Sequence, residues 1–203
     1  IMKTFIYRNY TVELMFEYLN VTFSDYGGIT EIDKSHEIYI WFYMIPMRTD
    51  INSVLKEIED YYLRLEIVIS QIPNEKTFLI FSLEDLFSNR WQNSDVRLRN
   101  AIQRYNYNIY AISELKSNVK VIDFYDFVKK YSESDLIDWK YYYLSNMLIN
   151  PNLYADFQLW FKRILFAIQS QRKKCLILDL DNTLWGGVLG EDGIEGIDLG
   201  NDF

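Results

Sequence analysis

The run Glu37-Ile38-Tyr39-Ile40-Trp41-Phe42-Tyr43 decides the fold class of this chain. After Glu37 it is apolar without interruption, whereas a strand with one wet face alternates apolar and polar residues. Such a run is typical of a strand in a parallel sheet that helices cover on both faces. The sequence therefore predicts an α/β domain in which Glu37–Tyr43 is a buried strand.

Shorter apolar runs and helical patterns alternate on both sides of this strand. The other predicted strands are Lys3–Tyr7, Val21–Ser24, Thr77–Phe81 and Val119–Asp123. The predicted helices are Val12–Leu19, Thr49–Gln71, Ser94–Lys116, Tyr125–Tyr131 and 150–170. Strands that alternate with helices indicate βαβ units, so we expect a doubly wound, flavodoxin-like, parallel five-stranded sheet.

Helix-end signals support several of these boundaries. Thr49 or Asp50 is suited to cap the long helix, and Pro73 ends it. Asn150 followed by Pro151 is a typical helix start. The stretch 132–149 is the longest without a helical or strand pattern, and irregular segments of this length often carry function.

Composition narrows the range of functions. The chain has 203 residues and a formal net charge of −8, which disfavours binding to nucleic acid or to an anionic membrane surface. Cys175 is the only cysteine, and the chain has neither a signal peptide nor a run of 18 apolar residues. These features predict a soluble protein in a reducing compartment, the cytoplasm.

The residues with the clearest chemical signal follow the apolar run 175–178. Asp179 and Asp181 are spaced i, i+2, so in an extended segment both carboxylates point the same way. Two carboxylates at a strand end suit Mg²⁺ and a substrate phosphate, with one as nucleophile and the other as acid and base. The alternative is an ordinary Asp/Asn-rich turn, in which Thr183 hydrogen-bonds the backbone.

This stretch resembles the first motif of the haloacid dehalogenase (HAD) superfamily, and the longer run 179–193 resembles the FkbH-like subfamily. The resemblance implies that Asp179 is the nucleophile and an Mg²⁺ ligand. It implies that Asp181 is the acid/base group and binds Mg²⁺ through its backbone carbonyl. Thr183, Trp185, Gly186 and Gly187 support the match, and the glycine-rich part would form the flap over the site.

The same resemblance implies a function for the parent protein. FkbH-like proteins handle a small phosphorylated substrate, a phosphoglycerate unit, and transfer the glyceryl group to an acyl carrier protein in polyketide or surface-polysaccharide pathways. The superfamily also needs a Ser/Thr, a Lys and an acidic pair further along the chain, and Phe203 comes too soon to supply them. We therefore expect a domain at 1–170, a linker at 171–174 and an inactive first piece of a HAD domain at 175–203.

A strand without its sheet would leave large apolar side chains in water. Burial of each such side chain stabilises a protein by about 1.5–3 kcal/mol. We expect 175–178 to pack against the first domain or to form a dimer by pairing with the same strand of another copy.

The first domain resembles the SGNH-hydrolase fold that FkbH-like proteins carry before their HAD domain. A serine esterase needs Ser, His and an acid. The loop after the first strand has Arg8, Asn9 and Thr11 but no serine, and the single histidine, His36, precedes the central strand. We therefore exclude Ser-His-Asp catalysis and expect His36 to be an exposed loop residue.

A cleft at the carboxyl ends of the strands remains possible. The residues expected to line it are Arg8, Asn9, Thr11, Ser82 and Asn146, where Arg8 is suited to pair with a carboxylate or phosphate. In the alternative interpretation, Asn9 and Thr11 only cap the next helix, and Glu84 with Asp85 forms a solvated turn.

An alternative function is a non-catalytic binding module that recruits a carrier protein or a glycan precursor. The chain contains 17 Tyr, 13 Phe and 5 Trp residues. Tyr and Trp are enriched at interfaces, so part of this aromatic set is suited to a partner surface.

Overall fold

The computed structural model describes residues 2–29, 34–48, 50–87 and 96–169. The chain divides into two compact units, Ile1–Arg163 and Ile164–Phe203. The predicted linker at 171–174, the strand at 175–178 and the motif that follows lie outside the described residues.

The first unit contains one parallel sheet of five strands. The strands are β1 (Lys3–Arg8), β2 (Asn20–Tyr26), β3 (Ile38–Phe42), β4 (Thr77–Phe81) and β5 (Val119–Ile122). Their order is β2-β1-β3-β4-β5, and every neighbouring pair is parallel. This confirms the predicted doubly wound, flavodoxin-like sheet, with β3 at its centre and all five of its residues buried.

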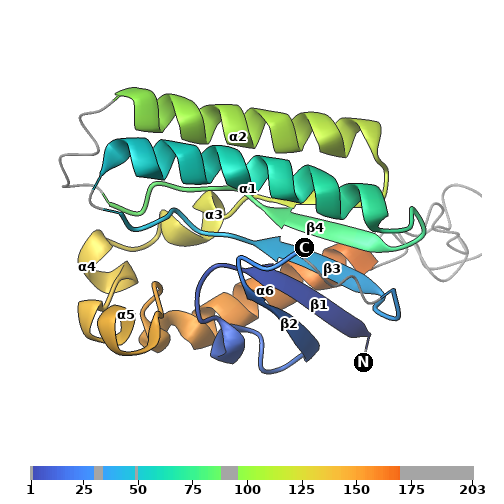
Figure 1. The fold of residues 1–203 in the computed structure, drawn as a ribbon. Helices are drawn as coiled ribbons and strands as arrows, with labels where there is room; N and C mark the ends of the chain where they lie inside the picture. Colours follow the sequence, from blue (N-terminus) through green and yellow to red (C-terminus); the bar gives the residue numbers. More distant parts are fainter. Residues whose placement is uncertain (1, 30–33, 49, 88–95, 170–203) are drawn as a thin grey trace, which may run out of the picture. The chain divides into compact units, whose positions relative to one another are not determined.

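Helices cover both faces of the sheet (Figure 1). α1 (Ile51–Gln71) and α2 (Val96–Leu115) lie on one face. The opposite face carries the 3₁₀ turn η1 (Glu13–Met15) and the part of α6 (Tyr154–Gln169) that precedes residue 164. Three short helices lie at the carboxyl ends of the strands: α3 (Tyr125–Val128), α4 (Glu133–Leu136) and α5 (Trp139–Ser145). No helix in the described ranges has the length and apolar character needed to cross a membrane.

Capping side chains fix the ends of several helices. Asp50 caps α1, because its carboxylate accepts hydrogen bonds from the backbone N–H and the hydroxyl of Ser53 at 2.9 and 3.0 Å. These hydrogen bonds lower the pKa of the Asp50 carboxyl. Asn150 accepts a hydrogen bond from the backbone N–H of Asn152, but the first turn is the 3₁₀ helix η3 (Pro151–Leu153), and α6 follows it.

Two sequence predictions of local structure are wrong. The helix expected at Val12–Leu19 is only the turn η1. The stretch 132–149, expected to be irregular, contains α4 and α5. Its helix-start signals are short-range: Ser132 and Asp135 form a capping box at α4, and Asp138 caps α5.

Aromatic rings fill the space on both sides of the sheet. On the face that carries α6, a buried cluster has ring centroids 4.4–6.3 Å apart and consists of Phe16, Phe42, Phe81 and Phe157. Beneath α1, Trp41 stacks on Tyr43 with centroids 4.0 Å apart, and Tyr7 and Tyr61 pack against these two rings. The density of aromatic residues in the sequence is thus largely accounted for by the core.

We predict that Phe157→Ala lowers the free energy of unfolding by about 3–5 kcal/mol, because the ring is fully buried and its loss leaves a cavity. Denaturant unfolding monitored by circular dichroism measures this. The control is Leu159→Ala on the same helix, where the side chain is 54% exposed and the change should stay within about 0.5 kcal/mol. Equal effects of the two substitutions would contradict the aromatic cluster beneath the sheet.

Candidate functional site

The strand order changes direction at the carboxyl ends of β1 and β3. β1 pairs with β2 on one side and with β3 on the other, so the chain leaves the sheet in divergent directions at this point. Open α/β sheets bind ligands at such a point. Arg8 ends β1, and Asn9, Tyr10 and Thr11 form the loop that follows.

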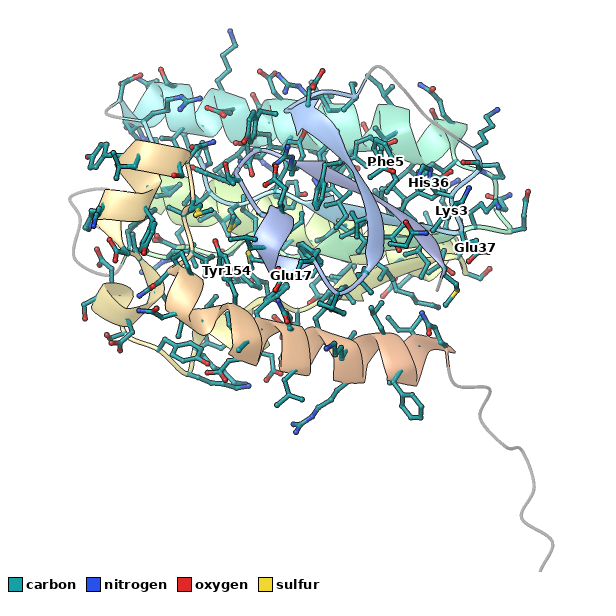
Figure 2. All side chains as sticks on the ribbon, turned by 90° about the horizontal axis from the view of Figure 1, so that it is seen from below. Lys3, Phe5, Glu17, His36, Glu37 and Tyr154 are labelled. Atoms are coloured by element: carbon teal, nitrogen blue, oxygen red, sulfur yellow. The ribbon has the colours of Figure 1, made fainter. Side chains whose placement is uncertain are left out.

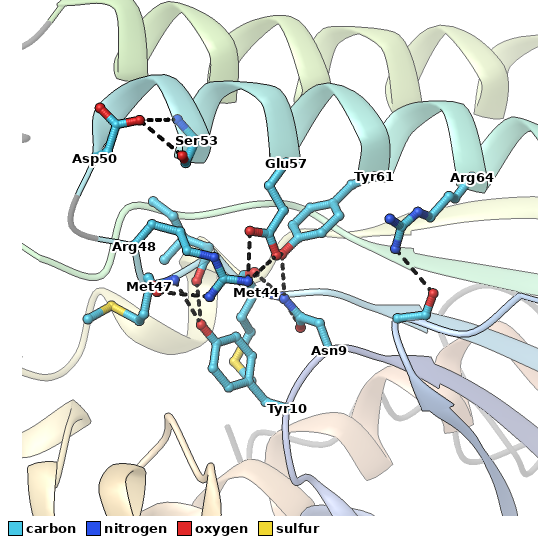
Figure 3. Close-up of polar contacts among 12 residues, drawn as sticks. Asn9, Tyr10, Met44, Met47, Arg48, Asp50, Ser53, Glu57, Tyr61 and Arg64 are labelled. Atoms are coloured by element: carbon cyan, nitrogen blue, oxygen red, sulfur yellow. Dashed lines mark hydrogen bonds and ion pairs between the residues drawn. The ribbon is translucent and has the colours of Figure 1, made fainter.

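Asn9 closes this position instead of facing an open cleft (Figure 3). Its side-chain amide donates to the backbone carbonyl of Met44 at 2.8 Å and accepts from the backbone N–H of Met44 at 3.0 Å. The same amide nitrogen donates to the hydroxyl of Tyr61 at 2.9 Å. The side chain therefore joins the loop after β1 to the loop after β3 and to α1.

The network continues from Tyr61 toward solvent (Figure 3). The Tyr61 hydroxyl donates to Glu57 at 2.9 Å, and Arg48 forms an ion pair with Glu57 at 3.0 Å. Burial raises the pKa of the Tyr61 hydroxyl, and the Glu57 carboxylate adds to the rise. A raised pKa favours the neutral form of the hydroxyl, which agrees with its donation of a hydrogen bond to Glu57.

Tyr10 reinforces the same closure. Its hydroxyl donates to the carbonyl of Ile45 at 2.9 Å and accepts from the backbone N–H of Met47 at 3.2 Å. The sequence analysis did not single out Tyr10, Tyr61, Glu57 or Arg48. The contacts of Tyr10 with Ile45 and Met47, and of Tyr61 with Asn9, span 35 to 52 residues, and no local pattern indicates them. Glu57 and Tyr61 are spaced i, i+4 on α1, and this spacing was a signal for their contact.

Arg8 is neutralised within the domain. Its guanidinium donates to the carbonyl of Ser24 at 3.2 Å, pairs with the Glu13 carboxylate and stacks over Tyr26, 4.5 Å from the ring centroid. The side chain is 8% exposed. The carboxylate partner expected for Arg8 therefore comes from its own chain, and binding phosphate would require breaking the Glu13 pair.

Thr11 and Asn146 do lie together, but through backbone groups. The backbone N–H of Thr11 donates to the carbonyl of Asn146 at 3.0 Å, and the Thr11 hydroxyl donates to the carbonyl of Ser145 at 2.6 Å. Asn146 has φ = 53°, a left-handed conformation that Asn tolerates at a helix end, and it terminates α5. The interpretation of Asn9 and Thr11 as helix caps is wrong, because both bond across the fold.

Ser82 belongs to a separate group at the ends of β4 and β5. Its hydroxyl donates to Glu84 at 2.6 Å and accepts from the backbone N–H of Phe124 at 2.9 Å. Burial raises the pKa of the Glu84 carboxyl, and the charges of Asp123 and Asp85 raise it further. Asp85 is exposed, as expected for a turn residue, whereas Glu84 is half-buried.

The prediction that His36 is exposed is wrong. His36 is 4% exposed and lies beside Phe5 (Figure 2). Its ring also packs against Tyr39, and Nε2 lies 3.2 Å from the Thr22 hydroxyl. It precedes β3, whereas Asn9 follows β1 at the other end of the paired strands. Arg8 pairs with Phe42, so Asn9 is level with position 43, seven residues beyond His36. At about 3.3 Å per residue this separates the two positions by about 23 Å.

Asp179, Asp181, Thr183, Trp185, Gly186 and Gly187 lie outside the described residues, so the structure does not bear on the proposed HAD site. Within the described ranges, no group of three or more His, Cys, Asp or Glu side chains is arranged to hold a metal ion. Any Mg²⁺ site of the predicted kind therefore rests on the sequence.

We predict that Asn9→Ala lowers the free energy of unfolding by about 1–3 kcal/mol, since it leaves both backbone groups of Met44 without their partners. The matched control is Asn74→Ala in the exposed turn before β4, with an expected change within about 0.5 kcal/mol.

Asn9→Ser should gain no activity on p-nitrophenyl acetate above wild type, because His36 is at the far end of the sheet. Esterase turnover by Asn9→Ser would contradict this geometry.

Comparisons with known proteins support the fold. No protein-family model matches the chain, and no curated protein matches it. Among solved structures, the chain is similar to the N-terminal part of the protein BF1531 from Bacteroides fragilis, which contains a phosphatase domain and is complexed with Mg. The TM-score is 0.62 at 20% identity, over 100% of this chain and 61% of that one.

A member of the lipolytic G-D-S-L family from Veillonella parvula also matches, with a TM-score of 0.48 at 15% identity, over 84% of this chain and 100% of that one. The first of these two similarities shows that the chain shares the α/β fold of the BF1531 segment, and that it spans less than two thirds of that segment's length.

Proposed function

We propose that this chain is part of an Mg²⁺-dependent phosphatase or phosphotransferase in which Asp179 and Asp181 are the reacting groups. The observation that carries the proposal is the sequence from Cys175 to Thr183, an apolar run followed by Asp-x-Asp-x-Thr. The N-terminal part of BF1531, which contains a phosphatase domain and is complexed with Mg, is similar in fold to this chain, and this similarity supports the proposal.

In the proposed reaction, a carboxylate oxygen of Asp179 attacks the phosphorus of a phosphomonoester. A new P–O bond to Asp179 forms while the ester P–O bond breaks, and Asp181 in its acid form gives a proton to the leaving oxygen. Asp181 then takes a proton from a water molecule, which attacks the phosphorus and releases phosphate from Asp179. Mg²⁺ would be held by the Asp179 carboxylate and the backbone carbonyl of Asp181, and would supply positive charge against the phosphate oxygens.

In this proposal the domain formed by residues 2–163 has no catalytic role. The polar residues at its switch point are committed to internal contacts: Asn9 to Met44 and Tyr61, and Arg8 to Glu13. A small phosphorylated carboxylate as substrate, and an acyl carrier protein as acceptor, are extensions of the proposal that rest on the FkbH-like resemblance alone.

A second candidate function is recruitment of a carrier protein or a glycan precursor, and it can coexist with the first. The exposed side of α5 supports it, because Tyr143 and Leu144 are 77% and 74% exposed. Adjacent exposed side chains of this kind fit a partner surface better than a solvated loop.

We predict that the 203-residue chain shows no Mg²⁺-dependent hydrolysis of p-nitrophenyl phosphate, whereas the longer parent protein does. Asp179→Asn should abolish the parent's turnover, and Asp181→Asn should reduce it by at least about 100-fold. Both variants should keep the wild-type melting temperature. Turnover by the 203-residue chain that Asp179→Asn abolishes would show that the chain already holds a complete site. Full activity of the Asp179→Asn parent would overturn the proposal.

For the second candidate, titration with a phosphopantetheinylated acyl carrier protein should shift NMR resonances of α5. Leu144→Ser should weaken that binding about fivefold or more. Leu115→Ser is the control, because Leu115 is 86% exposed on α2. An absence of shifts at millimolar carrier protein would count against recruitment through α5.

A further inference from the structure

A cavity of about 630 Å³ lies beyond the carboxyl ends of β4 and β5. The turn after β4 forms one side, and α3, α4 and the start of α5 form the other, which Figure 1 shows as a group next to the sheet. Small-molecule sites typically enclose about 300–1,000 Å³. The cavity is therefore of a size to take a small ligand, at a position separate from the closed switch point.

Aromatic and aliphatic side chains make up much of the wall. Tyr125 on α3 is 55% exposed and presents its ring to the cavity region, and Trp139 opens α5. The Trp139 ring is held in place by stacking on Phe87, with centroids 6.1 Å apart. Leu136 and Ile137, which also line the cavity, are buried. Rings held in this way offer π faces to a ligand without a large ordering cost.

The charged groups of the wall are mainly acidic. Asp85 and Glu133 both line the cavity, one from the turn after β4 and the other from α4. One Asp85 oxygen accepts from the backbone N–H of Phe87 at 3.1 Å. Asp85 keeps contact with solvent through the cavity mouth, yet partial burial raises the pKa of its carboxyl, and the charge of Glu133 adds to the rise.

Lys129 is the basic side chain among the described residues that line the cavity. Its ammonium lies 2.7 Å from the Asp126 carboxylate and 5.8 Å from the centroid of the Tyr125 ring. Arg99 on α2 lowers the pKa of Asp85, although less than burial and Glu133 raise it. A ligand that brings positive charge to Asp85 would therefore gain from the field of the site.

We propose that this cavity binds a small organic cation, an alkylammonium group that lies over the rings of Tyr125 and Trp139 with its charge directed at Asp85. Aromatic faces attract such cations, and a carboxylate at the same site adds direct attraction. Neither the proposed phosphatase chemistry nor the α5 surface uses these groups, so the inference goes beyond both.

The test is isothermal titration of the 203-residue chain with choline, compared with 3,3-dimethyl-1-butanol, its neutral isostere. Choline should bind saturably at millimolar concentration, and the neutral alcohol should bind about tenfold more weakly or not at all. Asp85→Asn should weaken choline binding about tenfold, and Tyr125→Leu about fivefold. Circular dichroism confirms that each variant is folded, and the exposed position of Tyr125 makes it the variant safest for folding.

The matched control is Glu75→Gln, at an exposed turn before β4. It changes the net charge by the same one unit as Asp85→Asn, so a general electrostatic effect would weaken both equally. Absence of saturable choline binding, equal binding of the neutral alcohol, or equal effects of Asp85→Asn and Glu75→Gln would each overturn the proposal. Asp179→Asn should leave choline binding unchanged, which separates this outcome from failure of the phosphatase proposal.

Discussion

The side chain of Asn9 hydrogen-bonds to the backbone beyond the end of β3, as a neighbouring strand would do if the sheet were one residue longer. The pairing of β1 with β3 ends at Arg8 and Phe42, so the backbone N–H and C=O of Met44 have no strand partner. The Asn9 amide supplies both a donor and an acceptor to that one residue. Because buried backbone groups must be paired, this contact allows the loops after β1 and β3 to stay closed against α1.

The same contact explains why the switch point is unsuited to esterase chemistry. A serine at position 9 has one hydroxyl, which cannot reproduce both bonds to Met44 together with the bond to Tyr61. A free nucleophile there would also need a histidine, and His36 is buried at the amino-terminal side of β3. A residue at position 9 can therefore either join the two loops or act as a nucleophile, and in this chain Asn9 joins the loops.

Sequence reasoning succeeded where the signal is local or periodic. Continuous apolar character identified β3, and the two candidate caps, Thr49 and Asp50, marked the start of α1, which Asp50 caps. It failed where the partner comes from another strand. His36 looks like a loop residue, but the register that pairs Thr4 with Ile38 brings Phe5 and Tyr39 against its ring. The bonds of Asn9 span 35 and 52 residues, and no local pattern encodes them.

Side chains of the chain itself fill the switch point at β1 and β3, whereas the proposed ligand cavity lies at the ends of β4 and β5. There Ser82 binds the backbone N–H of Phe124 and thereby ties the end of β4 to the chain that leads into α3. That tie fixes the spacing between the turn holding Asp85 and the helix holding Tyr125. α4 and α5, two short helices with side-chain caps, then complete the wall. The cavity is thus a consequence of how β4 and β5 end, whereas Asn9 joins the loops that follow β1 and β3.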